Sequence, residues 1–436
     1  MKIELSYGKT GLIVELPDTL DAEVTVIEPK FVPGVEDEAA ALLESLRKPI
    51  GCEPLAEMAA KLGPEQKVAV VVCDATRPVP NWRILPVVLG ELERAGVTRE
   101  QIAIVNALGT HRPSPREELV EMLGEEVVDN YRIVQHDCRG RDTMICVGRL
   151  STGSELWLNA DYVEADLRIT TGFIEPHFFA GFSGGPKLVL PGIASLENVM
   201  EAHSFPVIDS PKATWGVTKG NPVHDLVREA AAMARPHFSL NVTLNRNKEI
   251  TAVFAGDLDA AHEQGIEYVR EVAMQAVGEP FDIVITTNSG YPLDRNLYQA
   301  VKGMSAAAEV VRPGGAIVAA AQCIDGIPSG SHYHGLLERS VTPGGAMDLI
   351  AGAPEVIPDQ WQVQVQARVQ LKADVYLYSE CLSDEEIRAA MLIPCRDIGA
   401  LVEELIRKTA QSLPEGRRVR VCVLPEGPQT IPYLTL

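Results

Sequence analysis

The 436-residue chain is long enough for two or three domains, each with its own hydrophobic core. Apolar residues make up 46% of the chain and charged residues 23%, which is typical of globular proteins and excludes a fibrous or disordered class. The formal net charge of -21 at pH 7 argues against binding to nucleic acids or anionic membranes, because both would be repelled. A small anionic substrate is not excluded, since the local charge of a pocket can oppose the overall charge.

Eight cysteines are scattered along the chain without a Cys-x-x-Cys pair. This spacing argues against a zinc ribbon, an iron–sulfur cluster and a disulfide framework. The first residues lack the apolar core of a signal peptide, and the apolar run 316–322 is too short to span a bilayer. We therefore expect no membrane segment and a cytoplasmic location.

Apolar runs of strand length alternate with segments of helical period. The first part of the chain predicts three pairs of strand and helix: 67–73 with 82–95, 101–106 with 115–123, and 167–171 with 195–202. Continuous apolar strands that alternate with helices indicate a buried parallel sheet. Ligands bind at the carboxyl ends of the strands in such sheets, so we expect the loops that leave these three strands to converge.

A long amphipathic helix is predicted over 259–277, and a second α/β block follows it. The elements predicted in this block are a strand at 281–287, a helix reaching about residue 311, strands at 314–321, 373–378 and 418–423, and a helix at 401–413. The sequence therefore predicts two α/β domains with an active-site cleft between them. We place the first domain at 1–270 and the second at 271–436.

The segment 172–192 is rich in glycine and proline, which predicts a loop. Gly184 and Gly185 allow close approach of the backbone to a ligand, and Pro186 stiffens the approach to Lys187. This is not a phosphate-binding P-loop, because a proline precedes the lysine and a leucine follows it. A glycine-rich surface turn with a solvated lysine explains the same residues equally well.

Polar residues follow each of the three predicted strands. Asp74 and Arg77 share one loop, where the guanidinium offers a planar fork that matches a carboxylate. His111 and His177 leave the other two strands and can exchange protons with a substrate hydroxyl near neutral pH. Taken singly, these residues are better explained by structural roles: Asp74 as a turn cap, Arg77 as a solvated side chain, and each histidine as a structural residue.

Further candidates come from the end of one helix and from the second block. His203 ends the helix predicted at 195–202, where a histidine usually complements the helix dipole, and a metal-ligand role is the alternative. Gln299 and Lys302 are three residues apart and share a helix face that can close over an anion or simply be solvated. Tyr298 and Trp361 can flank such a site or pack inward.

Together, these motifs resemble those of the nickel-pincer lactate racemase family. The matching motifs are Asp74-Ala-Thr-Arg-Pro, Gly109-Thr-His-Arg-Pro, Gly172-Phe-Ile-Glu-Pro-His177, the loop 179–195, His203, Tyr291-Pro-Leu-Asp through Lys302, and Asp359-Gln-Trp361. The resemblance implies a racemase or epimerase of a 2-hydroxy acid. It also implies a pyridinium-3,5-bisthiocarboxylic acid mononucleotide-type cofactor, which grips nickel through two sulfurs and a ring carbon.

The resemblance also assigns roles to residues of this sequence. Lys187 would form the covalent thioamide link to the cofactor, beside the backbone of Gly184, Gly185 and Pro186, and His203 would be the nickel ligand. His111 and His177 would be the acid/base pair. Six further residues would bind or surround the substrate, with the carboxylate held by the arginine and the lysine: Asp74, Arg77, Lys302, Gln299, Tyr298 and Trp361.

The implied reaction is reversible hydride transfer through a 2-keto acid, with lactate as the first candidate substrate. Malate, other short 2-hydroxy acids and sugar acids are alternatives, and the preferred enantiomer and the oligomeric state are left open. Cofactor-assembly enzymes would be transient partners. A nicotinamide-dependent dehydrogenase is disfavoured because no Gly-x-Gly-x-x-Gly follows the predicted strands. An alternative of another class is a non-catalytic hydroxy-acid binding protein.

Overall fold

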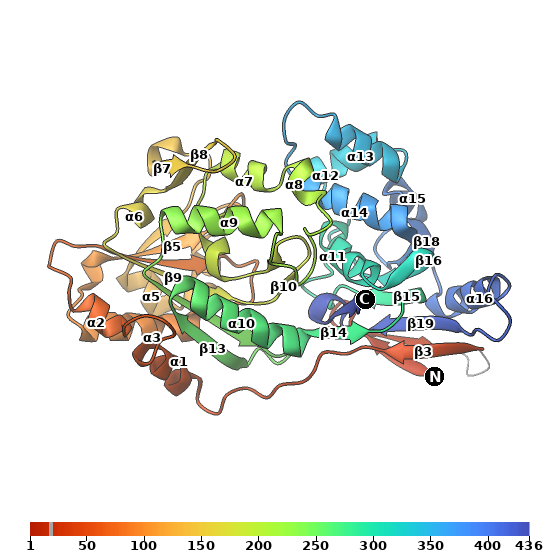
Figure 1. The fold of residues 1–436 in the computed structure, drawn as a ribbon, viewed down its shortest axis with the longest axis horizontal. Helices are drawn as coiled ribbons and strands as arrows, with labels where there is room; N and C mark the ends of the chain where they lie inside the picture. The colour runs from red at the N-terminus through yellow and green to blue at the C-terminus, as the bar shows by residue number, and fades with distance from the viewer. Residues whose placement is uncertain (17–20, 436) are drawn as a thin grey trace. The chain divides into compact units, whose positions relative to one another are not determined.

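The computed structural model describes residues 1–16 and 21–435, which form two compact units. The first unit consists of Phe31–Ala202 and Lys212–Val272. The second unit consists of Met1–Lys30, His203–Pro211 and Ala273–Leu436. Each unit is built on a six-stranded sheet with helices, so the predicted α/β class with two parts is confirmed (Figure 1).

The sheet of the first unit has the strand order β13-β12-β9-β4-β5-β6. Its strands are β4 Val68–Cys73, β5 Ile102–Ala107, β6 Arg132–Gln135, β9 Leu167–Phe173, β12 Phe238–Leu244 and β13 Ile250–Gly256. Neighbouring strands are parallel except for the antiparallel pair β12 and β13. All six residues of β4 are buried, because a central parallel strand is covered on both faces and favours apolar, β-branched residues.

Helices and two small hairpins complete the first unit. The helices are α1 Glu38–Arg47, α2 Leu55–Ala59, α3 Asn81–Arg94, α4 Arg116–Leu123, α5 Glu125–Asn130, α6 Ala160–Val163, α7 Leu196–Ala202, α9 Pro222–Met233 and α10 Leu258–Ala273. The hairpins pair β7 Met144–Arg149 with β8 Glu155–Asn159, and β10 Pro176–His177 with β11 Gly181–Phe182. Asn221 caps α9 by accepting hydrogen bonds from the N–H groups of Val223 and His224.

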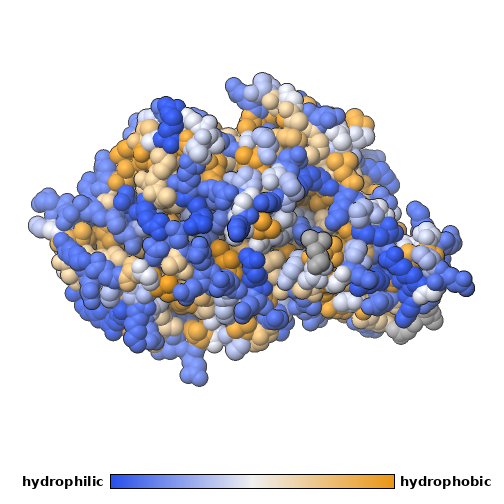
Figure 2. All heavy atoms as spheres, viewed as in Figure 1, coloured by the Kyte–Doolittle hydropathy of each residue, from blue (hydrophilic) through white to orange (hydrophobic). Residues whose placement is uncertain are grey.

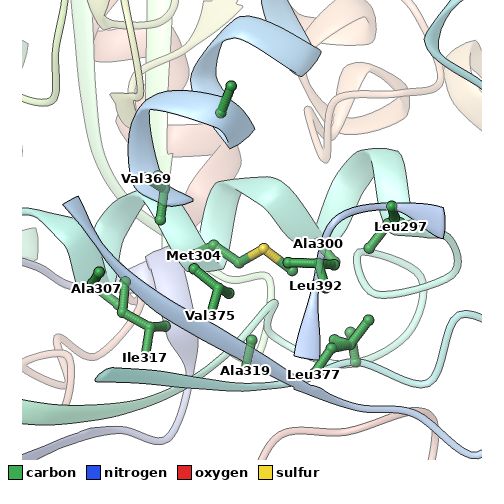
Figure 3. Packing of buried hydrophobic residues seen from close by; sticks show 14 of the residues in the cluster. Leu297, Ala300, Met304, Ala307, Ile317, Ala319, Val369, Val375, Leu377 and Leu392 are labelled. Atoms are coloured by element: carbon green, nitrogen blue, oxygen red, sulfur yellow. The ribbon is translucent and has the colours of Figure 1, made fainter. Parts of the chain in front are cut away.

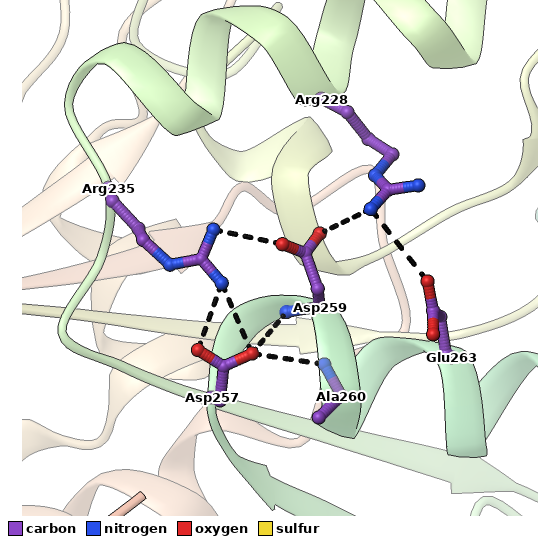
Figure 4. A network of polar contacts seen from close by, with 6 residues as sticks. All are labelled: Arg228, Arg235, Asp257, Asp259, Ala260 and Glu263. Carbon is purple, nitrogen blue, oxygen red and sulfur yellow. Dashed lines mark hydrogen bonds and ion pairs between the residues drawn. The ribbon is translucent and has the colours of Figure 1, made fainter. Parts of the chain in front are cut away.

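An ion-pair network fixes α9 to the start of α10 (Figure 4). Arg235, just after α9, binds Asp257 and Asp259, with its nitrogens 2.9 Å from a carboxylate oxygen of each. Arg228 of α9 binds Asp259 at 3.1 Å and lies 3.7 Å from Glu263. Because these side chains are partly exposed, each pair contributes about 1 kcal/mol or less, and the network mainly fixes the register of the two helices.

The sheet of the second unit is parallel throughout, in the order β18-β17-β16-β15-β19-β3. Its strands are β3 Ala22–Val26, β15 Phe281–Thr287, β16 Val311–Ala320, β17 Ala373–Tyr378, β18 Ile393–Cys395 and β19 Val419–Leu424. Its helices are α8 Phe205–Ile208, α11 Leu297–Ala308, α12 His332–Arg339, α13 Pro343–Ala351, α14 Gln360–Lys372, α15 Asp384–Ala389 and α16 Ile398–Ala410. Two further strand pairs are β1 Lys2–Leu5 with β2 Leu12–Glu15, and β14 Met274–Val277 with β20 Ile431–Leu434.

Two hydrophobic clusters of the second unit receive alternate residues of its central strands, because successive strand side chains point to opposite faces. Ile317 of β16 packs in one cluster with Met304 of α11, whereas its neighbour Val318 packs in the other with Val402 of α16. Figure 3 shows Met304 between α11 and the strands that carry Ile317 and Val375. Met304 is fully buried, and its burial contributes about 1.5–3 kcal/mol to holding α11 on the sheet.

Hydrophilic residues predominate on the face of the protein drawn in Figure 2, with hydrophobic residues scattered among them. Over residues 1–16 and 21–435, no helix combines the length and apolar character that crossing a bilayer requires.

The strands predicted from apolar runs are all present, with ends that differ by a few residues at most. Two predicted helices extend too far, and the one predicted to reach about residue 311 ends at Ala308, just before β16 begins at Val311. The segment 259–277 is helical only to Ala273, and Met274–Val277 form β14, which pairs in parallel with β20 near the end of the chain. The periodicity of residues 259–277 does not predict this strand, because its pairing partner lies far away in the sequence.

The compact units differ in two segments from the consecutive domains predicted at 1–270 and 271–436. Met1–Lys30 groups with the second unit, because β3 pairs with β19. His203–Pro211 also groups with the second unit, where its backbone accepts hydrogen bonds from α14. The chain therefore passes between the units more often than a consecutive division allows.

Candidate active site

Three loops leave the carboxyl ends of β4, β5 and β9, which are neighbouring parallel strands of the first unit. The loop after β4 carries Asp74 and Arg77, and the loop after β5 carries His111. The side chains of Asp74 and His111 meet, with His111 Nδ1 2.6 Å from Asp74 Oδ2. The predicted convergence of strand-end residues therefore holds for this pair.

Asp74 is buried, whereas about half of the His111 side chain is exposed. Burial alone would raise the pKa of the Asp74 carboxyl. Hydrogen bonds from His111 and Thr76, together with the charges of His111 and Arg77, outweigh burial and lower this pKa below its ordinary value. The ionised carboxylate accepts a hydrogen bond from Nδ1–H of His111. The other ring nitrogen of the exposed imidazole, Nε2, is then unprotonated and can accept a proton.

Thr76 supplies the second contact to the carboxylate, with its hydroxyl donating to Asp74 Oδ1 at 2.7 Å. The backbone N–H of Arg77 donates to the carbonyl of Asp74 at 3.2 Å, which closes the turn. Asp74 thus stabilises the turn and also orients His111. The guanidinium of Arg77 is half-buried beside this pair.

His177 lies in β10 and is buried among aromatic rings. Its ring centroid is 5.0 Å from that of Phe178 and 4.5 Å from that of Phe179. Its Nδ1 accepts from the backbone N–H groups of Phe179 and Ala180 at 3.4 and 3.3 Å, the long end of the hydrogen-bond range. A neutral imidazole accepting at Nδ1 has its proton on Nε2, so His111 and His177 present opposite tautomers.

Lys187 lies in the short 3-10 helix Gly185–Leu188 that follows the β10–β11 hairpin. Its ammonium nitrogen is 5.7 Å from the ring centroid of Phe179. The preceding loop is fixed by buried polar side chains of other elements: Asn221 donates to the Phe179 carbonyl at 2.9 Å, and Asn241 accepts from the Gly185 N–H at 2.9 Å. This loop is therefore held by the protein itself.

The glycines before Lys187 are needed for packing against the protein. Gly184 has φ +74, and a Cβ there would lie 2.8 Å from both the side-chain oxygen of Asn241 and the carbonyl of Phe173. Gly185 has φ +50, and a Cβ there would lie 2.5 Å from the imidazole of His262. Protein atoms therefore fill the space on the side where a Cβ would project, and the predicted approach of this backbone to a ligand stays a prediction. Pro186 is buried and occupies the first turn of the 3-10 helix.

Two histidines beneath this loop were missed in the sequence, where each stands alone in an amphipathic helix. His224 of α9 and His262 of α10 are buried, and their rings stack with centroids 6.3 Å apart. His262 Nε2 donates to the Ser183 carbonyl at 2.9 Å, and His224 makes a hydrogen bond to the backbone of Ala180. Both therefore support the loop that leads to Lys187.

Burial is the largest cause that lowers the pKa of each of these histidines to about 4. For His224, the positive charges of His262, Arg228 and Lys187 act in the same direction. For His262, the charge of Asp259 and the hydrogen bond to Ser183 oppose the decrease without cancelling it. Both imidazoles are consequently neutral at pH 7.

We expect the folded chain to lose stability as the pH falls from about 6.5 towards 4. The folded pKa values of His224 and His262 are about 4, below the ordinary value of 6.5, so the unfolded chain binds more protons in this window. His262→Gln removes one titrating group and retains an N–H donor for Ser183. Urea unfolding at pH 7 and pH 5 should show a loss of stability that is smaller in this variant by about 2 kcal/mol. Equal losses in both proteins would contradict the expectation.

In the second unit, helix α11 positions Tyr298, Gln299 and Lys302. Asn296 caps this helix by accepting from the backbone N–H of Gln299 at 3.0 Å. Gln299 and Lys302 are both half-buried and lie one turn apart, as their spacing predicts. Tyr298 packs edge-on against the ring of Tyr333, with centroids 5.3 Å apart, so it is a packing residue as well as a site candidate.

Trp361 brings two of these candidates together. Its indole N–H donates to the hydroxyl of Tyr298 at 3.2 Å, and its ring centroid is 4.6 Å from that of His203. Trp361 and His203 are 8% and 7% exposed, so protein atoms cover most of both residues. The contacts thus join Asp74 with His111 in the first unit, and Trp361 with Tyr298 and His203 in the second, while His177 and Lys187 lie elsewhere in the first unit.

Comparisons with known proteins cover both units. Residues 7–216 match the family model of the lactate racemase N-terminal domain, and residues 277–431 match that of the lactate racemase C-terminal domain. The chain is 36% identical over 431 residues to the lactate racemase of Thermoanaerobacterium thermosaccharolyticum, and 38% identical over 427 residues to that of Lactiplantibacillus plantarum. Each alignment covers 98% of both proteins.

Solved structures agree with these sequence matches. The lactate racemase apoprotein of T. thermosaccharolyticum superimposes with a TM-score of 0.90 at 35% identity, over 99% of this chain and 100% of the other. A protein of Thermotoga maritima shares the fold, with a TM-score of 0.66 at 20% identity over 93% of this chain.

These matches place the chain among α/β enzymes, in agreement with its parallel sheets. Within this class the chain is an isomerase by family. It belongs to the lactate racemase family, whose N- and C-terminal domain models match both halves of the sequence. The resemblance drawn from the motifs is thereby confirmed.

Proposed function

We propose that this chain interconverts the enantiomers of a 2-hydroxy acid, with lactate as the substrate to test first. The observation that supports this most directly is the Asp74–His111 pair, in a chain that matches lactate racemases over nearly its whole length. An exposed imidazole whose Nδ1–H is held by a buried carboxylate is a competent base for a hydroxyl proton. Inverting a carbon that bears a hydroxyl requires such a group.

We assign the remaining roles as the family resemblance implies. His111 and His177 form the acid/base pair, and each takes the hydroxyl proton of one enantiomer and returns it in the reverse direction. Arg77 and Lys302 hold the substrate carboxylate, and Gln299, Tyr298 and Trp361 line the site. For His177 to accept a proton, Nδ1 must release the long contacts to Phe179 and Ala180, whereas Asp74 already binds Nδ1–H of His111 and leaves Nε2 as the acceptor.

The donor set fits the nickel-pincer cofactor that the resemblance implies. Over residues 1–16 and 21–435, no three His, Cys, Asp or Glu side chains gather to hold a metal ion. A group that brings most of its own nickel ligands needs one amine and one imidazole from the protein, and Lys187 and His203 supply these. When bound, this group supplies a hydride acceptor and donor for the α-carbon of the substrate.

The chain's own residues then perform three tasks. The fixed loop before Lys187 presents one defined attachment point, which reduces the entropic cost of orienting the bound group. Arg77 fixes the carboxylate so that the hydroxyl faces His111. The aromatic side chains of Phe178 and Phe179, which pack against His177, restrict access of water to its ring.

Lactate is favoured over malate by the position of Arg295. A second carboxylate would need a second cation, and Arg295 lies near the start of α11. Its guanidinium is instead paired with Asp325 at 2.5 Å and is half exposed. We therefore place lactate first, malate and larger hydroxy acids next, and a binding role without catalysis last. A cytoplasmic location and transient contact with cofactor-assembly enzymes belong to the same proposal.

The test is to produce the chain with and without the family's cofactor-assembly enzymes. We expect an increase in intact mass that maps to Lys187, one nickel per chain, and racemisation of lactate, all only in the first preparation. α-Deuterated lactate should retain its label on inversion in ordinary water, because hydrogen that moves as a hydride does not exchange with solvent. Washout of the label would refute the hydride route. A loaded chain that inverts no 2-hydroxy acid would refute the function.

A further inference from the structure

Helix α14 has an unusual sequence, with glutamine at every second position from 360 to 366. Gln360, Gln362, Gln364 and Gln366 are at most 1% exposed. A spacing of two residues turns about 200° around a helix, so these amides point in different directions. Burying an amide is unfavourable unless it is hydrogen-bonded, which suggests that each amide has a specific partner.

Two of these amides bind segments that carry proposed site residues, whereas Gln360 binds the backbone of Ile357 and Gln366 binds Tyr333 and Ala390. Gln362 donates to the carbonyl of Tyr298 in α11. Gln364 Nε2 donates to the carbonyl of Phe205 at 3.0 Å, and the guanidinium of Arg368 donates to the carbonyl of Ile208 at 2.7 Å. Positions 361, 364 and 368 form one stripe of the helix, and this stripe contacts the segment His203–Pro211 along its length.

The segment His203–Pro211 depends on these contacts for its position. Its helix, α8, has four residues, which is too short to be stable alone. The last carbonyls of a helix lack partners within the helix, and Arg368 satisfies that of Ile208. The chain on both sides of the segment belongs to the first unit, whereas the segment itself groups with the second. Helix α14 is therefore what keeps His203 beside Trp361.

We propose that Gln364 and Arg368 are positioning residues for His203. They hold the turn after His203 against α14, and so fix the direction in which the imidazole points beside Trp361. The proposal rests on the proposed function in one respect, that His203 is the nickel ligand. Residues that orient a metal ligand typically change metal affinity by about 10–100-fold when they are removed.

The chain offers a matched control on the same helix. Gln370 Nε2 donates to the carbonyl of Met391 at 2.7 Å, in a part of the second unit remote from α8 in sequence. In both Gln364 and Gln370 the side-chain oxygen is buried without a hydrogen-bond partner. Gln364→Met and Gln370→Met therefore each remove an amide donor from a backbone carbonyl at similar volume. Gln364→Met releases the segment that contains α8, whereas Gln370→Met releases the backbone at Met391.

The first measurement is hydrogen exchange on the cofactor-free chain, followed in peptides that cover 203–211 and 388–393. We expect Gln364→Met to accelerate exchange of the Val207, Ile208 and Asp209 amides at least about tenfold, because these amides are protected by the α8 turn. Gln370→Met should leave this peptide unchanged. If the peptide 203–211 exchanges at the native rate in Gln364→Met, the proposal is overturned, whether or not the chain can bind the cofactor.

The second measurement uses chains produced with the assembly enzymes. Gln364→Met and Arg368→Met should retain the mass increase at Lys187 but lose nickel to a chelator about tenfold faster than the native chain. Arg368→Lys should restore retention, because an ammonium can still donate to the Ile208 carbonyl. Equal nickel retention in Gln364→Met and Gln370→Met would overturn the metal role of the segment. A native chain that gains neither mass nor nickel would refute the proposed function, while the exchange result would still decide how His203 is held.

Discussion

Replacing Lys187 by alanine is expected to abolish both the mass increase and racemisation. The amine of Lys187 is the proposed point of covalent attachment, and no other lysine lies in the loop 172–192. Loss of the attached group removes the hydride acceptor, so the rate should fall by at least about 10⁴-fold, to the background of the assay. Intact mass, nickel content and chiral analysis of lactate, on chains produced with the assembly enzymes, measure this.

Lys187→Arg is the matched control for the charge of this residue. Arginine retains a cation near the Phe179 ring and a similar length, but a guanidinium does not form the amide-type link. We expect this variant to be as inactive as Lys187→Ala, with a Tm close to that of the native chain. Racemisation by either variant at a substantial fraction of the native rate would show that Lys187 is not the attachment point.

The local pattern of apolar and polar residues predicts much of this fold, because the buried strands of a parallel sheet appear in the sequence as continuous apolar runs. The run Val68–Cys73 is apolar throughout since both faces of β4 are covered, and the polar residues begin where the strand ends. The rule that strand ends converge then predicts that Asp74 and His111 lie close together, and they are hydrogen-bonded. Residue type and position along a strand suffice for this part of the site.

What the sequence does not predict depends on pairing between distant segments. Gly185 indicates a close approach, but not that the approaching group is the imidazole of His262. His262 itself appears as a lone histidine in an amphipathic helix, and its hydrogen bond to Ser183 spans 79 residues. His203 follows a helix of the first unit but is held by α14 of the second. Periodicity carries no information about such contacts, because they arise only from tertiary packing.

Replacing Asp74 by asparagine is expected to lower kcat by about 10²–10⁴-fold with little change in fold. The carboxylate holds the Nδ1–H tautomer of His111 and stabilises the imidazolium that forms when Nε2 takes the hydroxyl proton. An amide removes the charge. Its N–H group can also turn towards His111 and favour the tautomer with the proton on Nε2, which cannot act as a base. Steady-state rates of lactate inversion from each enantiomer measure the effect.

Thr76→Val is the matched control, because it removes a hydrogen bond to the same carboxylate at Oδ1 but leaves the contact between Oδ2 and His111. A purely structural role of the Asp74 turn would make both variants equally slow. We expect Thr76→Val to reduce kcat only a few-fold, since one neutral hydrogen bond contributes about 1 kcal/mol. The pKa of Asp74 is lowered, so the native rate should not fall through protonation of this carboxyl above pH 5. A rate for Asp74→Asn within about threefold of the native rate would remove Asp74, and with it the oriented His111, from the proposed mechanism.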